Sequence, residues 1–182
     1  MIGKVIFWIA VIVIVGGLFG VYMIRNVGHD PAVWHADPLS APTPTTPNSF
    51  RMVPVIEGYD PVTTERIDAE SPIYDANPAL ISQAFDDYVR RQPRTERIAG
   101  QPETGWMTYV QQSEVMRFSD YISVKFIDLG RGQSTVAIFS RSRMGHSDMG
   151  VNEQRVRNWL EPLSSFEAPP ADPLGPQADG DL

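Results

Sequence analysis

Three arginines near the ends of candidate strands are the residues best suited to chemistry in this 182-residue chain. Arg141 and Arg143 lie two positions apart, so on a strand their guanidinium groups project from one face. Arg117 ends an earlier candidate strand and is expected nearby. Guanidinium groups donate paired hydrogen bonds to phosphate and carboxylate groups. The cluster is therefore a candidate site for an anionic ligand or a lipid headgroup.

Acidic residues around this cluster allow a structural interpretation, which the sequence favours. Asp120, Asp148 and Glu114 are available to pair with the arginines and to pin the last helix. Asp148 also precedes the expected start of that helix, where its carboxylate can accept hydrogen bonds from the amides of Gly150 and Val151. The sequence leaves both a structural corner and a binding site open.

The loop between the last strand and the last helix contains further residues with expected roles. Gly145 and Gly150 are expected to permit positive φ or close backbone approach, and Asn152 to bond a loop carbonyl. We expect Gly145, Gly150 and Asp120 to be structural. The candidate ligand or partner residues are Arg117, Arg141, Arg143, His146, Ser147, Asp148 and Asn152.

Catalysis is the least favoured interpretation of this loop. His146, Ser147 and Asp148 have the residue types of a hydrolase triad, but consecutive side chains do not point at one another. The other histidines, His29 and His35, lie in a spacer, and the chain has no cysteine, so a His-rich or Cys-ligated metal site is not expected. We predict no catalytic residue, no metal, no cofactor and a non-enzymatic function.

The N-terminal region predicts a membrane anchor, residues 1–25. Residues 5–24 carry no charge, and a helix of this length spans roughly 30 Å, the hydrocarbon thickness of a bilayer. A signal peptide has a shorter apolar region and a small-x-small cleavage site. Lys4 precedes the run, whereas residues 26–48 contain Asp30 and Asp37 but no Lys or Arg. This weak bias predicts a single-pass protein of the bacterial cytoplasmic (inner) membrane with a periplasmic domain.

Composition divides the rest of the chain into three parts. Residues 26–49 are rich in proline and are expected to form a semi-rigid spacer. Residues 50–163 have the size of one domain, and the acidic residues 164–182 are expected to be disordered. The tail carries much of the net charge of −7, so the domain has no strong basic field and nucleic-acid binding is not expected.

The domain is predicted to have an α+β fold. Hydrophobic spacing indicates helices at residues 78–91 and 151–163, with strands at 95–99, 106–115, 121–127 and 135–143 between them. Short turns make the strands antiparallel neighbours, so we expect a two-layer sandwich of a four-stranded antiparallel sheet and two helices after the transmembrane helix. The open sheet face is expected to carry Tyr109, Gln111, Ser113, Lys125 and Arg141 and to be available for binding.

Four motifs together resemble one protein family. They are the segments Trp34–Leu39, Tyr109–Ser113, Met116–Val124 and Ser140–Asn152. This set resembles the alphaproteobacterial, membrane-anchored branch of the DUF1499 family. The resemblance implies a small envelope-associated domain and supplies no reaction, substrate or catalytic residue.

The sequence therefore predicts an envelope protein whose domain binds a protein partner or a membrane component. The alternative is binding of an anionic ligand or lipid headgroup through the arginines, and a hydrolase is a less favoured third. Trp34 is expected at the membrane interface, in a groove of its own domain, or on a partner.

Overall fold

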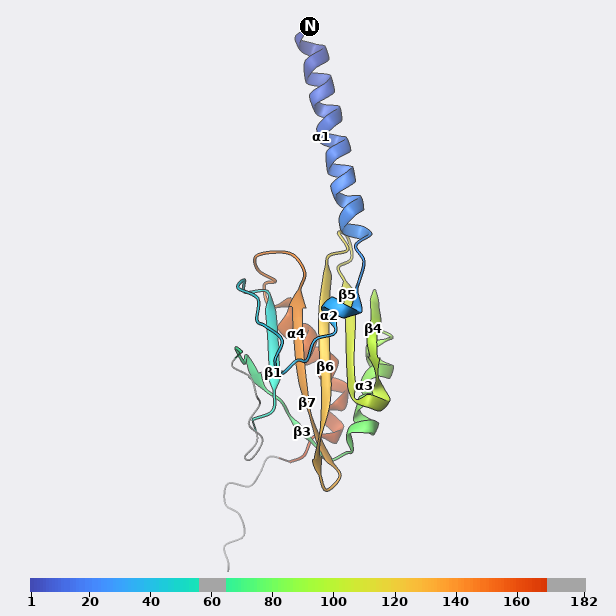
Figure 1. The fold of residues 1–182 in the computed structure, drawn as a ribbon, viewed down its shortest axis with the longest axis vertical. Helices are drawn as coiled ribbons and strands as arrows, with labels where there is room; N and C mark the ends of the chain where they lie inside the picture. The colour runs from blue at the N-terminus through green and yellow to red at the C-terminus, as the bar shows by residue number, and fades with distance from the viewer. Residues whose placement is uncertain (56–64, 170–182) are drawn as a thin grey trace, which may run out of the picture.

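A computed structural model describes residues 1–55 and 65–169. Helix α1 (Ile2–Arg25) extends away from the domain as one long rod (Figure 1) and has no buried residue. Within the described part of the chain, it is the one helix long and apolar enough to cross a membrane. Because it is fully exposed, α1 is not the core helix of a soluble domain. Its position and composition are those of a membrane anchor or a signal sequence.

Among the described residues, the domain is built on a mixed sheet of seven strands. The strands are β1 (Ser49–Val53), β2 (Ala69–Glu70), β3 (Ile73–Tyr74), β4 (Thr95–Gln101), β5 (Trp106–Gln112), β6 (Ser119–Gly130) and β7 (Gln133–Ser142). Their order is β2-β1-β7-β6-β5-β4, and β3 also pairs with β7. The pairing of β1 with β2 is parallel and all the others are antiparallel.

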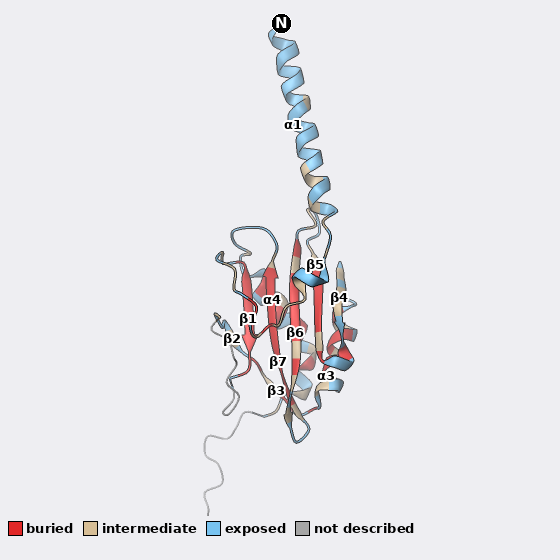
Figure 2. Ribbon diagram, in the orientation of Figure 1, coloured by how far each residue is buried: buried red, intermediate tan, exposed pale blue. Residues whose placement is uncertain are grey.

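Two helices cover one face of this sheet, here called the helix face. Helix α3 (Pro78–Val89) begins at Asn77, whose side chain accepts a hydrogen bond from the amide of Leu80 at 2.9 Å. Helix α4 (Val151–Leu160) continues into the 3₁₀ turn η2 (Glu161–Phe166). The apolar stripes of both helices pack on inward-facing strand residues, so the core lies between helices and sheet (Figure 2). The sheet residues in this core include Met107, Tyr109, Ile122, Val124, Phe126, Val136 and Ile138.

The opposite face of the sheet is covered by residues 26–48, which we call the strap. The strap contains the short helix α2 (Pro31–Trp34), whose N-cap residue Asp30 accepts a hydrogen bond from Ala32 N at 2.9 Å. After α2 the chain crosses β6 and β7 toward β1, with a turn at residues 38–40 (Figure 1). We name this side of the sheet the strap face. The segment predicted as a semi-rigid proline-rich spacer therefore docks on its own domain, and Trp34 takes the position within its own domain that was one of the three expected for it.

The predicted α+β class and the antiparallel β4–β7 meander agree with the structure, whereas the sheet is larger than expected. Strands β1, β2 and β3 were missed. β1 is buried along its whole length, so it has no period-two pattern, and β2 and β3 have two residues each. The expected tail also begins too early, because η2 extends to Phe166 and Glu167 bridges to Tyr74. Residues 170–182 of that tail lie outside the described residues.

Two of the five residues expected on the open face belong to the helix face instead. Tyr109 is paired with the core residue Ile122, and antiparallel partners point to the same side of a sheet. The Tyr109 hydroxyl donates to Asp86 Oδ1 of α3 at 2.8 Å, and Gln111 bonds Arg155 of α4. Burial and the neighbouring Asp86 charge raise the pKa of Tyr109, so this hydroxyl stays protonated. Ser113 lies just beyond β5, whereas Lys125 and Arg141 contact the strap.

Candidate functional site

The two arginines at the end of β7 both bind the strap. Arg141 Nη2 donates to the carbonyl oxygen of Trp34 at 2.9 Å, and Arg143 Nη1 donates to that of Gly28 at 2.9 Å. Both guanidinium groups also lie against the Trp34 ring, at 5.5 Å and 5.6 Å from its centroid. Arg143 further donates to the Tyr121 hydroxyl at 3.1 Å. Neither arginine forms a salt bridge within the described part of the chain.

Aromatic stacking fixes the middle of the strap. The rings of Trp34 and Tyr121 are nearly parallel, at 6°, with centroids 3.6 Å apart. The next residue, His35, stacks on Trp106 at 4.2 Å, and its Nδ1 lies 2.9 Å from Thr108 Oγ1. Burial lowers the pKa of His35, so the docked imidazole favours its neutral form.

Two more polar contacts attach the strap to the sheet, one before and one after the stacked rings in the sequence. His29 Nδ1 lies 2.9 Å from the Tyr121 hydroxyl, and Asp37 forms a 2.7 Å salt bridge with Lys125. The pKa of His29 is lowered chiefly by burial, against an opposing contribution from Glu96. The strap is thus held by stacked rings, guanidinium–carbonyl bonds and one ion pair, with few buried aliphatic contacts.

A third arginine lies beside Arg141 on this face. It is Arg51 of β1, which is fully buried. Their guanidinium carbons lie 4.0 Å and 5.1 Å from the centroid of the same ring, Phe139. Arg51 Nη2 donates to the Ala41 carbonyl oxygen and lies 3.4 Å from Thr43 Oγ1, so the far end of the strap closes over it.

The two buried arginines keep unused donors. Arg51 Nε, Arg51 Nη1 and Arg141 Nη1 are buried and have no hydrogen-bond partner among the residues that the structure describes. Arg141 is only 7% exposed. Burial, with repulsion from Arg51, lowers the pKa of Arg141 to about 10, so it remains charged at neutral pH. Buried charges are normally paired. Glu65 and Asp68 act electrostatically on Arg51, and the donors named above remain available beneath the strap.

The corner after β7 is a hydrogen-bonded structural element. Asp148 accepts hydrogen bonds from Gly150 N at 3.2 Å and from Asn152 N at 2.9 Å, at the start of α4. Asn152 is fully buried, and its side chain donates to Asn48 O at 2.9 Å and accepts from Ser140 Oγ at 2.6 Å. The corner therefore joins β7, α4 and the end of the strap.

The expected pairing of Arg141 or Arg143 with nearby acids is not present. Asp120 pairs with Arg155 of α4 at 2.5 Å, on the helix face. Asp148 accepts only backbone donors among its hydrogen bonds in the described chain. The mistake has a simple physical origin. Neighbouring strand residues point to opposite faces, so Asp120 and the Arg141 side chain are separated by the sheet.

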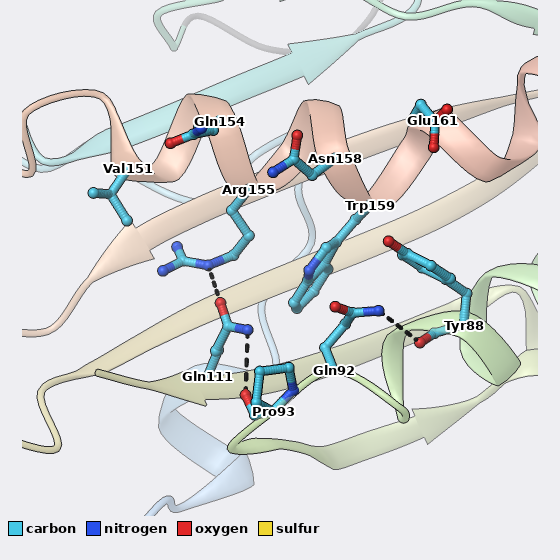
Figure 3. A pocket seen from close by; sticks show the side chains of 10 residues that line it. All are labelled: Tyr88, Gln92, Pro93, Gln111, Val151, Gln154, Arg155, Asn158, Trp159 and Glu161. Carbon is cyan, nitrogen blue, oxygen red and sulfur yellow. Dashed lines mark hydrogen bonds between the residues drawn. The ribbon is translucent and has the colours of Figure 1, made fainter. Parts of the chain in front are cut away.

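A cleft of about 410 Å³ opens between α3, α4 and β5 (Figure 3). Its centre is Arg155, whose three guanidinium nitrogens all donate to protein acceptors. Figure 3 shows the Arg155–Gln111 bond across the cleft and the further bond from Gln111 to Pro93 O. Because Arg155 is satisfied, this cleft offers no free cation to an anion. The lining residues are Tyr88, Gln92, Pro93, Gln111, Val151, Gln154, Arg155, Asn158, Trp159 and Glu161.

The remaining candidate residues lie in two loops and do not assemble into a catalytic group. Arg117 has φ +60° and forms no side-chain hydrogen bond with any described residue. His146 and Ser147 are exposed, and Ser147 Oγ accepts from Met149 N at 3.3 Å. Gly145 and Gly150 have positive φ, as expected.

Sequence reasoning missed Arg51 and Arg155, and it gave docking of Trp34 on its own domain as one of three expected positions. Arg51 stands between Phe50 and Met52, both in the core, which was a readable sign that it projects from the other face of a strand. Arg155 lies between Gln154 and Val156 on a helix with several other polar residues, and it gave no such sign.

Fold and site together define an α+β domain with one face closed by helices and an arginine-rich face closed by its own N-terminal segment. The chain belongs to the DUF1499 family, described as "Protein of unknown function (DUF1499)", whose model matches residues 40–163. Residues 28–39, which supply most of the strap contacts, precede the matched region. Comparison with curated proteins gives no match.

Proposed function

We propose that this protein is a single-pass membrane protein whose domain is held at the bilayer surface, where it binds a membrane component or a protein partner without catalysing a reaction. The docked strap is the observation that carries this proposal. Only Asn26 and Val27 separate the end of α1 from Gly28, which is bonded to Arg143. A free segment from residue 26 to residue 48 would reach roughly 75 Å. When the strap is docked, only Asn26 and Val27 connect α1 to the domain.

The non-enzymatic part is supported by the candidate residues themselves. A nucleophile needs a base within hydrogen-bond distance, and the base needs an orienting group. His146 makes no hydrogen bond to Ser147 or Asp148 among the described contacts, and Asp148 binds backbone amides. On the strap face, Arg141 Nη2 and Arg51 Nη2 bond strap carbonyl oxygens rather than a catalytic group.

Docking of the strap can be measured by spin-label distances, because the chain has no cysteine to interfere with labelling. Nitroxides at Ala32→Cys in the strap and Arg131→Cys in the β6–β7 hairpin should give one narrow distance distribution in the full-length protein. A broad distribution would mean that the strap is a free tether. Arg131→Cys paired with Gln83→Cys, both on the domain, gives the width expected for a rigid pair.

We further propose that the domain lies in the periplasm of a bacterial cell, on the weak charge bias around α1. A C-terminal alkaline phosphatase fusion should be active, and a green fluorescent protein fusion exported by the general pathway should stay dark. Bright fluorescence with an inactive phosphatase would place the domain in the cytoplasm. Membrane crosslinking with mass spectrometry then tests for a defined partner.

The unused donors of Arg51 and Arg141 favour a second candidate, binding of an anionic ligand under a displaced strap. The strap carbonyls of Ala41 and Trp34 would be exchanged for phosphate or carboxylate oxygens, which bind guanidinium groups more strongly. Inorganic phosphate should then raise the melting temperature above that in chloride at equal ionic strength, and Arg141→Gln should abolish the difference. Equal melting temperatures in both salts would exclude this candidate.

A further inference from the structure

Two loops of the domain lie at the end where α1 leaves it. The pairs Gln112↔Ser119 and Asp120↔Ser142 place the β5–β6 loop, residues 113–118, beside the β7–α4 loop, residues 143–150. The bond from Arg143 to Gly28 O joins this end to the first residues after α1. Figure 1 shows both loops at the α1 end of the sheet, with the β6–β7 hairpin at the far end.

These loops carry large apolar side chains in solvent. Met149 is 94% exposed and Val115 is 74% exposed, and Phe118 and Met144 are also exposed. None of the large apolar residues that the structure shows as exposed lies in the β6–β7 hairpin, residues 128–133, at the opposite end. Clustered exposed apolar side chains commonly mark a contact surface. Here the cluster lies where a bilayer would be if α1 spans it.

Backbone conformation distinguishes Met149 from the other exposed apolar side chains of the loops. It has φ +53°, a region that glycine adopts with less strain, whereas the other described non-glycine residues with positive φ, Arg94, Arg117 and Arg131, are all arginines. Glycine at position 149 would also remove an exposed apolar side chain. Both folding and solubility therefore disfavour methionine there, and the side chain is explained by a contact outside the domain.

Bilayer dimensions agree with this contact. The apolar run of α1 matches the hydrocarbon thickness, and each headgroup region adds only about 5 to 8 Å. Asn26 and Val27 can extend roughly 7 Å, so Gly28 lies near the outer edge of the headgroups. The loops beside Gly28 then lie within reach of the headgroup layer.

We propose that the loops 113–118 and 143–150 form a membrane-contact surface that inserts Val115, Phe118, Met144 and Met149 into the headgroup layer. This inference rests on the proposed function in requiring that α1 spans the bilayer. The two arginines of the loops are matched by Glu114 and Asp148, so the contact is apolar and needs no anionic lipid. Arg117 extends its aliphatic part along the surface and its guanidinium group to phosphate.

Nitroxide depth measurements on the full-length protein in nanodiscs test this surface. Single-cysteine variants Val115→Cys and Met149→Cys should show raised oxygen and lowered nickel-complex accessibility, equally in phosphatidylcholine and in phosphatidylcholine with phosphatidylglycerol. Arg131→Cys in the hairpin should be fully aqueous, and Val13→Cys in α1 should be deep. Adding Met149→Gly, which suits the backbone, should shift the label at position 115 toward the aqueous values.

The labels at positions 13, 115 and 149 test the anchoring of α1 separately from the contact of the loops with the membrane. Aqueous labels at 115 and 149 with a deep label at 13 would overturn the contact surface and leave the anchor intact. A label at 13 that is not deep would overturn the proposed anchoring and the contact surface together. Labels at 115 and 149 shielded from oxygen and nickel complex alike would indicate a protein contact, which also overturns the lipid surface.

Discussion

The two faces of the sheet are closed in different ways. On the helix face, α3 and α4 bury an apolar core that contains Phe85, Trp159 and the inward-facing strand residues. On the strap face, an extended segment is held by the Trp34–Tyr121 stack and by carbonyl oxygens bonded to Arg51 and Arg141. The first kind of closure depends on hydrophobic burial, which dominates folding free energy. The second depends on a few polar and aromatic contacts. We therefore expect the strap to open while the domain stays folded.

The largest effect is expected on the helix face. Phe85 is fully buried and packs edge-on against the rings of Tyr109, Phe126 and Trp159, with centroids 6.0, 5.4 and 6.2 Å away. Phe85→Ala should lower the free energy of unfolding by about 3 to 5 kcal/mol through lost burial and a residual cavity. Urea denaturation in detergent, followed by far-UV circular dichroism, measures it. The exposed Leu80→Ala on the same helix should change it by less than about 0.5 kcal/mol.

A smaller and more local effect is expected on the strap face. Trp34→Ala removes the stack on Tyr121 and the contacts with two guanidinium groups, which together contribute about 2 kcal/mol. Limited proteolysis should then cleave within residues 28–43 while the circular dichroism spectrum of the sheet is retained. The neighbouring Val33→Ala, an exposed position, should leave the strap protected. Loss of the whole fold in Trp34→Ala would refute the separability of the two faces.

The corner that joins both faces should respond less. Asp148→Ala should lower the free energy of unfolding by about 1 kcal/mol, because the amides of Gly150 and Asn152 lose their acceptor. Asp148→Asn should restore most of this, since the amide oxygen can accept the same bonds and no arginine pairs with the carboxylate. Thermal melts of the native protein and of the two Asp148 variants measure these differences in stability. Equal stabilities would show that this cap does not stabilise the fold.

The smallest effect concerns pH and the strap alone. Burial lowers the pKa of His29 and of His35, so docking prefers both rings neutral. Because the docked pKa lies below the free value of about 6.5, docking is complete above that pH and weakens as pH falls toward the docked pKa. Proteolysis of residues 28–43 should therefore accelerate below about pH 6.5. The double variant His29→Gln, His35→Gln should lose this dependence, and slower cleavage of the native protein at low pH would contradict it.

Local sequence signals predicted the elements of the helix face well. Asn77-Pro78 marked the start of α3, and the spacing of Val156, Trp159 and Leu160 marked the buried side of α4. Turns between short runs gave the β4–β7 meander. Each of these features is encoded within about 15 residues, where propensity and periodicity act.

The strap face could not be predicted in the same way. His35 meets Thr108 across 73 residues of sequence, and Trp34 meets Arg141 across 107, so no local pattern contains either contact. Proline-rich composition indicated an extended backbone, and an extended backbone serves a docked strap as well as a free spacer. Arg51 was not among the predicted site residues, and Arg141 was expected on an open sheet face. Because burial of arginine is rare, sequence alone did not indicate that either is buried.

The pairing of β1 with β7 has a consequence for biosynthesis. Strand β1 and the strap both bind residues near position 140, so the domain cannot close until nearly all of its chain has been made. Closing such long loops is entropically costly and slows folding. The nascent chain therefore has helix α1 long before it has a folded domain. Strand β7 then supplies the pairing partner of β1, and α4, which follows β7 in the chain, brings the last core residues, Val156, Trp159 and Leu160 among them.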